Sequence, residues 1–290
     1  MTLSLAIEQL LNGLQLGVML FLMAAGLTLV FGIMNLINLA HGSLYMIGAY
    51  LAATLQQATG SFLLAVLLTL PATALVGMLM EVVALRTLYA RDHLDQVLAT
   101  FGLILFFNEF VRIVWGPAGY FVSVPAALSG TVEILPGVPY PAFRLAILLV
   151  GLAVAAFLFW LVRRTRLGML IRAGASNRAM VGALGVNIRL LFTLVFGLGA
   201  ALAGLAGAMA APILAVQVGM GESILILTFV VIVIGGIGSI RGALLAALLV
   251  GVVDTFGRVL LPPAVAEMAI YLLMAAVLFW RPQGLLPAHV

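Results

Sequence analysis

The polar stretch NLINLAHGS, residues 35–43, contains the residue types in this 290-residue chain best suited to contact a small solute. Its amide and imidazole side chains can hydrogen-bond a polar molecule, and the amides of a helix starting after it would face a carboxylate. A structural interpretation fits equally well, because Asn and Ser cap helix ends and a histidine at a turn bonds to backbone. Both interpretations stay open for Asn35, Asn38, His41, Gly42 and Ser43.

A second polar stretch, VQVGMGES at residues 216–223, has the same two interpretations. The carboxylate of Glu222 can contact a solute's ammonium group or a protein that delivers the solute, with Gln217 and Ser223 beside it. A carboxylate in a short loop is also commonly only hydrated. We therefore treat both stretches as candidate segments of a substrate pathway.

The composition argues against covalent catalysis and nucleotide hydrolysis by the chain itself. It has no cysteine, and its three histidines (His41, His93 and His289) fall in separate segments, so we expect neither a metal site nor a catalytic cluster. It also has no lysine, which a phosphate-binding GxxxxGK[ST] loop requires. We expect no cofactor and no nucleic-acid partner.

The glycine-rich stretch GGIGSIRG, residues 235–242, resembles a dinucleotide fingerprint only superficially. It lacks the preceding strand and the acidic residue that a dinucleotide fold needs. Its glycines are better suited to a close-packed turn between two helices. They are Gly235, Gly236, Gly238 and Gly242.

The basic segment from Arg163 to Asn187 holds five of the thirteen arginines, although only 8% of the chain is charged. It lies between two long apolar runs, so we expect it outside the bilayer, and its charge favours the cytoplasmic side. From Arg172 onward, small residues recur at helical spacing and predict one helix with a face that another surface can approach closely. These residues are Ala175, Ala179, Gly182 and Val186. A solvated loop whose arginines only fix topology fits the pattern as well.

Long apolar runs must position these segments. The chain is 65% hydrophobic with a mean hydropathy of +1.31, far from a soluble domain. Several windows reach the roughly 18 apolar residues that a membrane-spanning helix needs. We therefore predict an all-α, polytopic helical bundle with eight or nine transmembrane helices, which forms a single domain over residues 1–290. The expected spans are 10–33, 44–55, 61–85, 97–115, 145–162, 190–214, 223–238, 243–261 and 266–280.

Alternate threading of these spans gives an asymmetric distribution of arginine. With the basic segment inside, ten arginines face the cytoplasm and three lie at the outer ends, as the positive-inside rule requires. The N-terminus is then outside and the C-terminus cytoplasmic. A long Gly/Pro-rich loop at 116–141 lies outside.

Two glycine-containing segments occupy equivalent places five spans apart. Gly26 is followed sixteen positions later by Gly42, and Gly204 seventeen positions later by Gly221. Alternate threading gives the two segments opposite directions, as in an inverted-topology repeat whose interrupted helices meet at a central pathway. With so few matching positions, an inverted repeat and a chance match remain equally open.

Four stretches together resemble the permease subunits of branched-chain amino-acid ABC importers. They are FGIMNLINLAHGSLYMIGAY (31–50), RTLYARDHLDQVLATFGLILFFNEF (86–110), RAGASNRAMVGALGVN (172–187) and VIGGIGSIRGALLAALLVG (233–251). They occur in the family's order and cover most of the chain. The chain departs from the family at Ser176-Asn177, where a carboxylate is frequent, and at Arg241, where an uncharged residue is usual.

The resemblance implies that residues 163–189 are a cytoplasmic coupling loop that contacts an ATP-binding subunit. Within that loop the implied contact residues are Arg172, Ala173, Asn177, Arg178, Ala179, Gly182, Gly185 and Asn187. It also implies a second permease subunit, two cytoplasmic ATP-binding subunits and an external substrate-binding protein, all serving a lipid-embedded permease of the bacterial inner membrane.

The cargo implied by the resemblance is a branched-chain amino acid, with urea or an amide as the alternative. A self-sufficient channel or secondary transporter would need ionisable residues deep in the spans, and the sequence has few. An intramembrane enzyme would need the catalytic cluster that is missing from the sequence.

Overall fold

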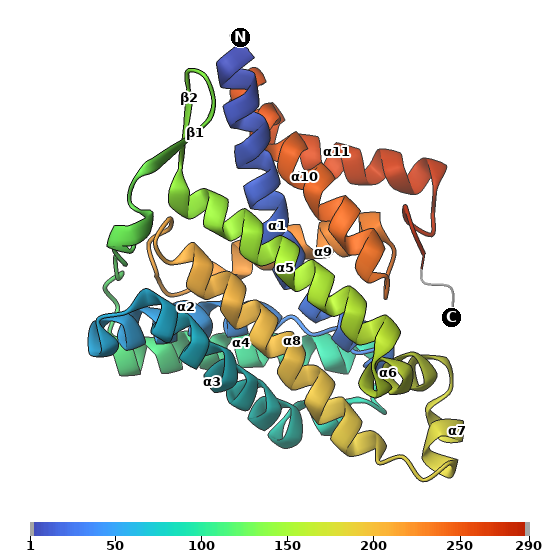
Figure 1. Ribbon diagram of the computed structural model, residues 1–290. Helices are drawn as coiled ribbons and strands as arrows, with labels where there is room; N and C mark the ends of the chain where they lie inside the picture. Colours follow the sequence, from blue (N-terminus) through green and yellow to red (C-terminus); the bar gives the residue numbers. More distant parts are fainter. Residues whose placement is uncertain (1–2, 288–290) are drawn as a thin grey trace.

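The computed structural model describes residues 3–287 and is built almost entirely of helices (Figure 1). His289 lies outside the described residues. The long helices are α1 (Leu3–Met34), α2 (His41–Thr59), α3 (Phe62–Val83), α4 (His93–Trp115), α5 (Ala142–Arg164), α8 (Ile188–Ala210), α9 (Met220–Gly235), α10 (Ile240–Leu260) and α11 (Pro263–Trp280). The short elements are η1 (Leu85–Leu88), η2 (Ala126–Leu128), β1 (Thr131–Leu135), β2 (Val138–Pro141), α6 (Arg166–Ser176) and α7 (Arg178–Ala183).

Seven helices within residues 3–287 are long and apolar enough to cross a membrane. The less apolar α2, with 19 residues, and the shorter α9, with 16, bring the number of long helices to nine. This agrees with the expected eight or nine spans. Helices α1 and α8 form the centre, since 83% and 72% of their most apolar windows are buried within the protein. Helix α11 buries only 11% of its window and leaves large apolar side chains exposed, as a lipid-facing helix does.

Two irregular segments enter the bundle from opposite ends. Residues 35–40 follow the end of α1 and lead into α2, whereas residues 211–219 follow the end of α8 and lead into α9. The side chain of His41, the first residue of α2, lies against Gly26, about 12 Å along α1 from that helix's last residue. Helix α2 therefore starts inside the bundle and not at its surface.

The start of α9 meets the start of α2 at the same depth. A Cβ atom on Gly42 or on Gly221 would collide with the backbone of the other, so the two helices touch through their main chains. Helices α1 and α10 pack together, and so do α3 and α8. In an inverted repeat, α1 would correspond to α8 and α3 to α10. The α1–α10 pair then corresponds to the α8–α3 pair, as an inverted repeat requires.

The helix ends gather at two opposite ends of the bundle. One end carries the β1–β2 hairpin, and the other carries α6 and α7 (Figure 1). Ten arginines belong to elements that meet at the α6–α7 end and three to elements that meet at the hairpin end. We call these the basic end and the hairpin end. The first described residues of α1 lie toward the hairpin end, because Asn12 bonds to Tyr140 and Arg144 there.

Three sequence-based expectations are corrected by the structure. The single helix expected from Arg172 to Asn187 is wrong, because Asn177 has an extended backbone that ends α6 and caps α7 through a bond from the Met180 amide. The sixth span ends at Ala210 and not at Leu214, since the chain must turn back into the bundle. The loop at 116–141 contains an antiparallel two-stranded sheet.

Candidate functional site

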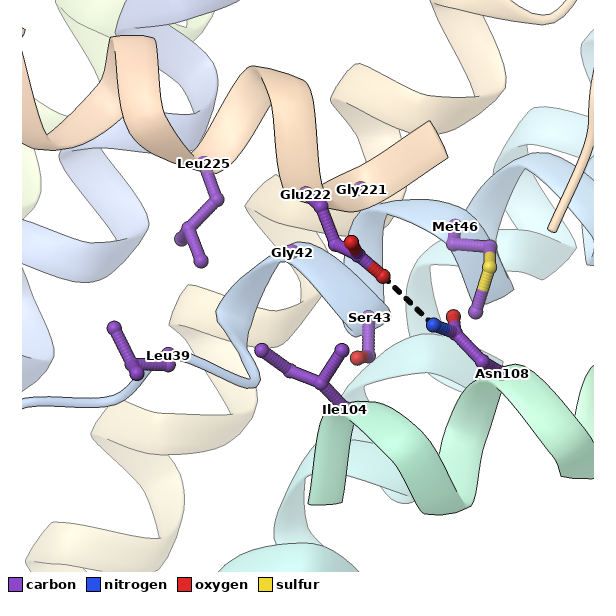
Figure 2. A pocket seen from close by; sticks show the side chains of 9 residues that line it. All are labelled: Leu39, Gly42, Ser43, Met46, Ile104, Asn108, Gly221, Glu222 and Leu225. Carbon is purple, nitrogen blue, oxygen red and sulfur yellow. Dashed lines mark hydrogen bonds between the residues drawn. The ribbon is translucent and has the colours of Figure 1, made fainter. Parts of the chain in front are cut away.

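The meeting point of α2 and α9 contains a small cavity, shown in Figure 2. Its volume is about 10 Å³, which is roughly the space that one water molecule needs. A solute larger than a water molecule cannot enter a space of this size, so the described structure is closed at this point. The lining residues are Leu39, Gly42, Ser43, Met46, Ile104, Asn108, Gly221, Glu222 and Leu225.

A hydrogen bond between α4 and α9 crosses the cavity. Asn108 donates to the Oε1 atom of Glu222 over 2.7 Å (Figure 2). Glu222 lies in the first turn of α9, where the positive end of the helix dipole favours a carboxylate. Met46 of α2 closes the adjoining side, where its sulfur accepts from the Gly219 amide at 3.4 Å. Opening the cavity toward the hairpin end therefore requires these bonds to break.

Asn38 and His41 are fully buried, and each is next in the sequence to a residue that lines the cavity, Leu39 or Gly42. Within residues 3–287 neither polar atom of the Asn38 amide has a hydrogen-bond partner. The His41 ring faces the backbone of Met23, and neither of its nitrogens makes a bond of good geometry within the same residues. A buried polar group without a partner costs about 1–3 kcal/mol, so the closed structure is not the state in which these groups are best satisfied.

The structure brings together only part of the expected pathway. Gly42, Ser43 and Glu222 line the cavity, while Gln217 and Ser223 are exposed and do not. Asn35 is also exposed and lies at the basic end, where its φ of 52° places it in the left-handed region. Asn108 and Ile104 were not expected, because nothing in the sequence indicates that α4 packs across the start of α9.

A larger polar cavity of about 260 Å³ lies at the basic end. It opens between the start of the 35–40 segment, the residues that precede α4 and the first residue of α7. Arg178 reaches across to donate to the backbone carbonyl of Met34 at 3.3 Å. The lining residues are Met34, Asn35, Tyr89, Ala90, Arg91, Asp92, His93, Gln96 and Arg178.

The basic segment folds as two short helices with side-chain caps. Thr165 accepts from the Gly168 amide at the start of α6, and Asn187 accepts from the Leu190 amide at the start of α8. Arg172 donates to the backbone carbonyl of Val162 in its own chain. We call residues 178–184, which comprise α7 and its C-cap Leu184, the α7 region. Within it, Met180 and Leu184 are 58% and 76% exposed, although the region lies beyond the ends of the spans.

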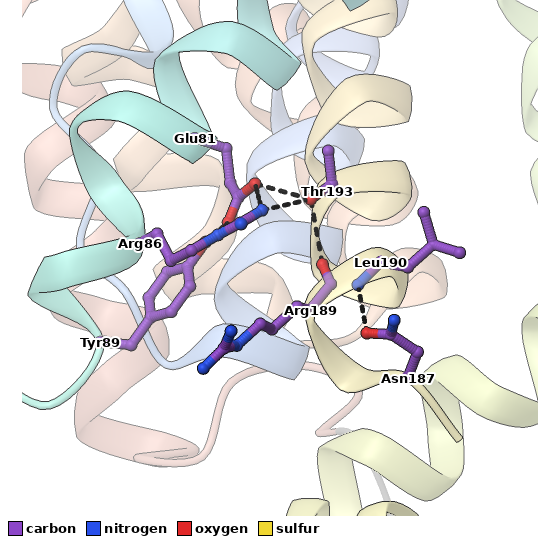
Figure 3. Close-up of polar contacts among 7 residues, drawn as sticks. All are labelled: Glu81, Arg86, Tyr89, Asn187, Arg189, Leu190 and Thr193. Atoms are coloured by element: carbon purple, nitrogen blue, oxygen red, sulfur yellow. Dashed lines mark hydrogen bonds and ion pairs between the residues drawn. The ribbon is translucent and has the colours of Figure 1, made fainter. Parts of the chain in front are cut away.

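A buried carboxylate lies next to the basic segment, at the end of α3 (Figure 3). Glu81 is fully buried and accepts from Arg86, Tyr89 and Thr193. The hydrogen bond from Arg86 to Glu81 raises the pKa of the guanidinium above its usual value, and burial is the main cause that raises the pKa of the Tyr89 phenol. The pairing of Glu81 with Arg86 is visible from their spacing, but Thr193 is 112 residues away and no sequence signal points to it.

Asp254 is the other carboxylate buried in a span of the described residues. Its Oδ2 atom accepts from Arg258 at 2.9 Å, four residues further along α10. Residues 3–287 contain no group of three or more His, Cys, Asp or Glu residues that could hold a metal ion. Each of the two buried carboxylates of the described residues, Glu81 and Asp254, thus pairs with an arginine close to it in the sequence.

Comparison with known proteins gives a consistent result over almost the full chain. Residues 9–278 match the family model described as the permease component of branched-chain amino acid transport systems. The chain is similar to the high-affinity branched-chain amino acid transport system permease protein BraD of Pseudomonas aeruginosa, with 34% identity over 97% of this chain and 95% of that protein.

More distant similarities extend the same result. The chain is 28% identical to the permease protein LivH of Escherichia coli, over 97% of this chain and 95% of that protein. It is 27% identical to a probable LivH permease of Methanocaldococcus jannaschii, over 82% of this chain and 76% of that protein. No solved structure was found to match the chain.

Proposed function

The chain belongs to the family of permease components of branched-chain amino acid transport systems, and from that premise we propose how it moves its cargo. The proposed cargo is a branched-chain amino acid, imported across the bacterial inner membrane through the meeting point of α2 and α9. ATP-binding partner subunits supply the energy. The observation that carries the proposal is the family match over residues 9–278, which includes both irregular segments and the basic segment.

The helix starts that meet at the small cavity suit a zwitterionic amino acid. Helices α2 and α9 both begin there, and within the described residues neither has a side-chain cap. The positive ends of two helix dipoles therefore point at the place proposed for the carboxylate. Glu222 supplies a negative charge for the ammonium group at the same place. Asn38 supplies an amide that gains a partner when the cavity opens and admits solute or water.

The α7 region is the proposed contact for the ATP-binding subunit. Large apolar side chains exposed outside a membrane span indicate a protein partner, and Met180 and Leu184 are the exposed pair here. Arg172 and Arg178 are exposed and stay part of the proposed contact. Both also donate to backbone carbonyls of their own chain, which helps to hold α6 and α7 in place.

The excess of arginine supports an orientation. Ten of thirteen arginines gather at the basic end, so that end is proposed to face the cytoplasm, with the hairpin end and the N-terminus outside. A second permease subunit and an external substrate-binding protein complete the proposed importer. The chain has no lysine, and this supports separate subunits for ATP hydrolysis.

Transport by the reconstituted importer tests the function. The permease subunits and the ATP-binding subunits are reconstituted together in liposomes, with ATP enclosed inside, where the basic end of this chain is proposed to lie. We expect these liposomes to accumulate radiolabelled leucine when the binding protein is added outside. Omission of the ATP-binding subunits should abolish uptake. Uptake of leucine by this chain alone would contradict the proposal, and uptake of urea in place of leucine would correct the cargo.

The ATPase contact is tested by the double substitution Met180→Glu and Leu184→Glu. Charged groups on the proposed apolar contact should prevent co-purification of the ATP-binding subunit, because a buried charge without a partner costs several kcal/mol. Leu135→Glu is the matched control, since Leu135 is 46% exposed in the β1–β2 hairpin at the opposite end. Co-purification that survives the double substitution would exclude this surface.

The substitution Asn38→Leu separates stability from transport. Replacing an unpartnered buried amide by an apolar side chain of similar size should raise the free energy of unfolding by about 1–3 kcal/mol, measured as a higher Tm in detergent. The same substitution should lower leucine transport, because the open state loses a polar contact. Asn12→Leu is the control and should lower the Tm, since Asn12 accepts hydrogen bonds from Tyr140 and Arg144. A fall in Tm for Asn38→Leu, or normal transport, would contradict the assignment.

Single cysteines test the orientation without background, because the natural chain has no cysteine. In right-side-out vesicles, Thr131→Cys in the hairpin should react with an impermeant maleimide. Ser176→Cys at the end of α6 should react only after the membrane is permeabilised. Both residues are exposed, so the difference reports the side of the membrane. Labelling of Ser176→Cys from outside would overturn the proposed orientation.

A further inference from the structure

The buried carboxylate of Glu81 accepts four hydrogen bonds and is fully satisfied (Figure 3). Its Oε1 atom accepts from Nε of Arg86 at 3.2 Å and from the Tyr89 hydroxyl at 2.9 Å. Its Oε2 atom accepts from Nη2 of Arg86 at 2.9 Å and from the Thr193 hydroxyl at 2.7 Å. Charge-assisted bonds to a carboxylate with no exposure to water hold these groups in one geometry.

This cluster joins α3 to the start of α8. Asn187 caps α8, and Thr193 lies six residues after it. The α7 region ends three residues before Asn187, at Leu184. Arg86 also donates to the Thr193 hydroxyl at 2.9 Å. The Oγ1 atom of Thr193 is therefore bonded to both Arg86 and Glu81. Tyr89 packs its ring edge against Phe192, with the ring centroids 5.3 Å apart. Any displacement of the base of α8 is therefore transferred to Arg86 and Tyr89.

Gln96 connects the same short loop to the irregular segment 35–40. Its side-chain amide donates to the carbonyls of Leu88 and Arg91, which lie on either side of Tyr89, at 3.2 Å each. Its Oε1 atom accepts from the backbone amide of Ile37 at 3.3 Å. Gln96 lines the larger polar cavity but is only 3% exposed, so little of its side chain is open to water. One buried side chain thus holds the loop around Tyr89 against the segment that leads into α2.

We propose that residues 81–96 form a mechanical bridge that carries movement of the base of α8 to the 35–40 segment and so to the meeting point of α2 and α9. Thr193 and Gln96 are its two positioning residues, and neither touches the cargo. The proposal rests on the proposed function, because the movement at α8 originates from the ATP-binding subunit. It adds a second link beside the 3.3 Å bond from Arg178 to Met34, whose donor residue is exposed.

The test measures leucine transported per ATP hydrolysed in the complete reconstituted importer. Thr193→Val removes one hydroxyl and keeps the shape, so this ratio should fall by about 2- to 30-fold, the range for a residue that modulates coupling between sites. The KM for leucine and the co-purification of the partner subunits should stay unchanged. Thr193→Ser should restore the ratio. Thr69→Val is the matched control, because the Thr69 hydroxyl is buried in α3 and bonds only to Ala65 of its own helix.

Gln96→Met tests the other end of the bridge, since it keeps the length of the side chain and removes all its hydrogen bonds. It should lower the ratio as Thr193→Val does, and the double variant should be no worse than the stronger single variant, because both interrupt one link. A normal ratio for either single variant, or effects that multiply in the double variant, would overturn the proposal. If the wild-type importer moves no leucine, the proposed function fails; if it moves leucine and only these variants behave normally, the bridge alone fails.

Discussion

The absence of water in the bilayer core governs this structure, because every backbone polar group at that depth must find a partner within the protein. Regular helices meet the requirement by themselves. The segments 35–40 and 211–219 do not, and their central residues Leu36, Asn38 and Val216 are therefore fully buried inside the bundle. The segments follow directly on α1 and α8, which have the two most buried spans. The peripheral helices surround this centre and expose their apolar faces, so the irregular segments can exist at all only because nine long helices isolate them from lipid.

Close contact of main chains is the second consequence of that enclosure. Gly42 and Gly221 touch through their backbones, and Gly48 packs against Gly204 in the same region. A Cβ atom on Gly42, Gly221 or Gly48 would collide with the neighbouring main chain, and one on Gly204 would collide with the side chain of Thr73. The starts of α2 and α9 could therefore not meet if Gly42 and Gly221 were larger residues. Glycine at these sites brings two positive helix ends together, and that is an arrangement suited to an anionic group.

The sequence predicted the spans well because hydropathy depends on local composition. It also drew attention to the two polar stretches, because amides and carboxylates are rare in such a chain, and their part in a pathway stays a proposal. It could not predict which segments meet. Thr193 and Glu81 are 112 residues apart, and their contact is set by the packing of α3 on α8. The spacing of small residues from Arg172 onward predicts a continuous helix, but Asn177 is a residue type that favours a helix cap and it interrupts that helix.

The distribution of satisfied and unsatisfied polar groups indicates which parts of the permease move. At the basic end, Glu81 and Gln96 have partners for all their side-chain oxygen and nitrogen atoms. Because breaking these hydrogen bonds costs free energy, the bonded segments resist local distortion and move together. At the centre, within residues 3–287, Asn38 has no partner for either atom of its amide, which lowers the cost of opening because the closed state has fewer bonds to lose. A transporter needs both properties. In the proposed importer, the rigid connection lies beside the ATP-binding subunit and delivers the displacement. The unpaired polar groups at the centre reduce the free energy needed to change the closed state into one that can hold the cargo.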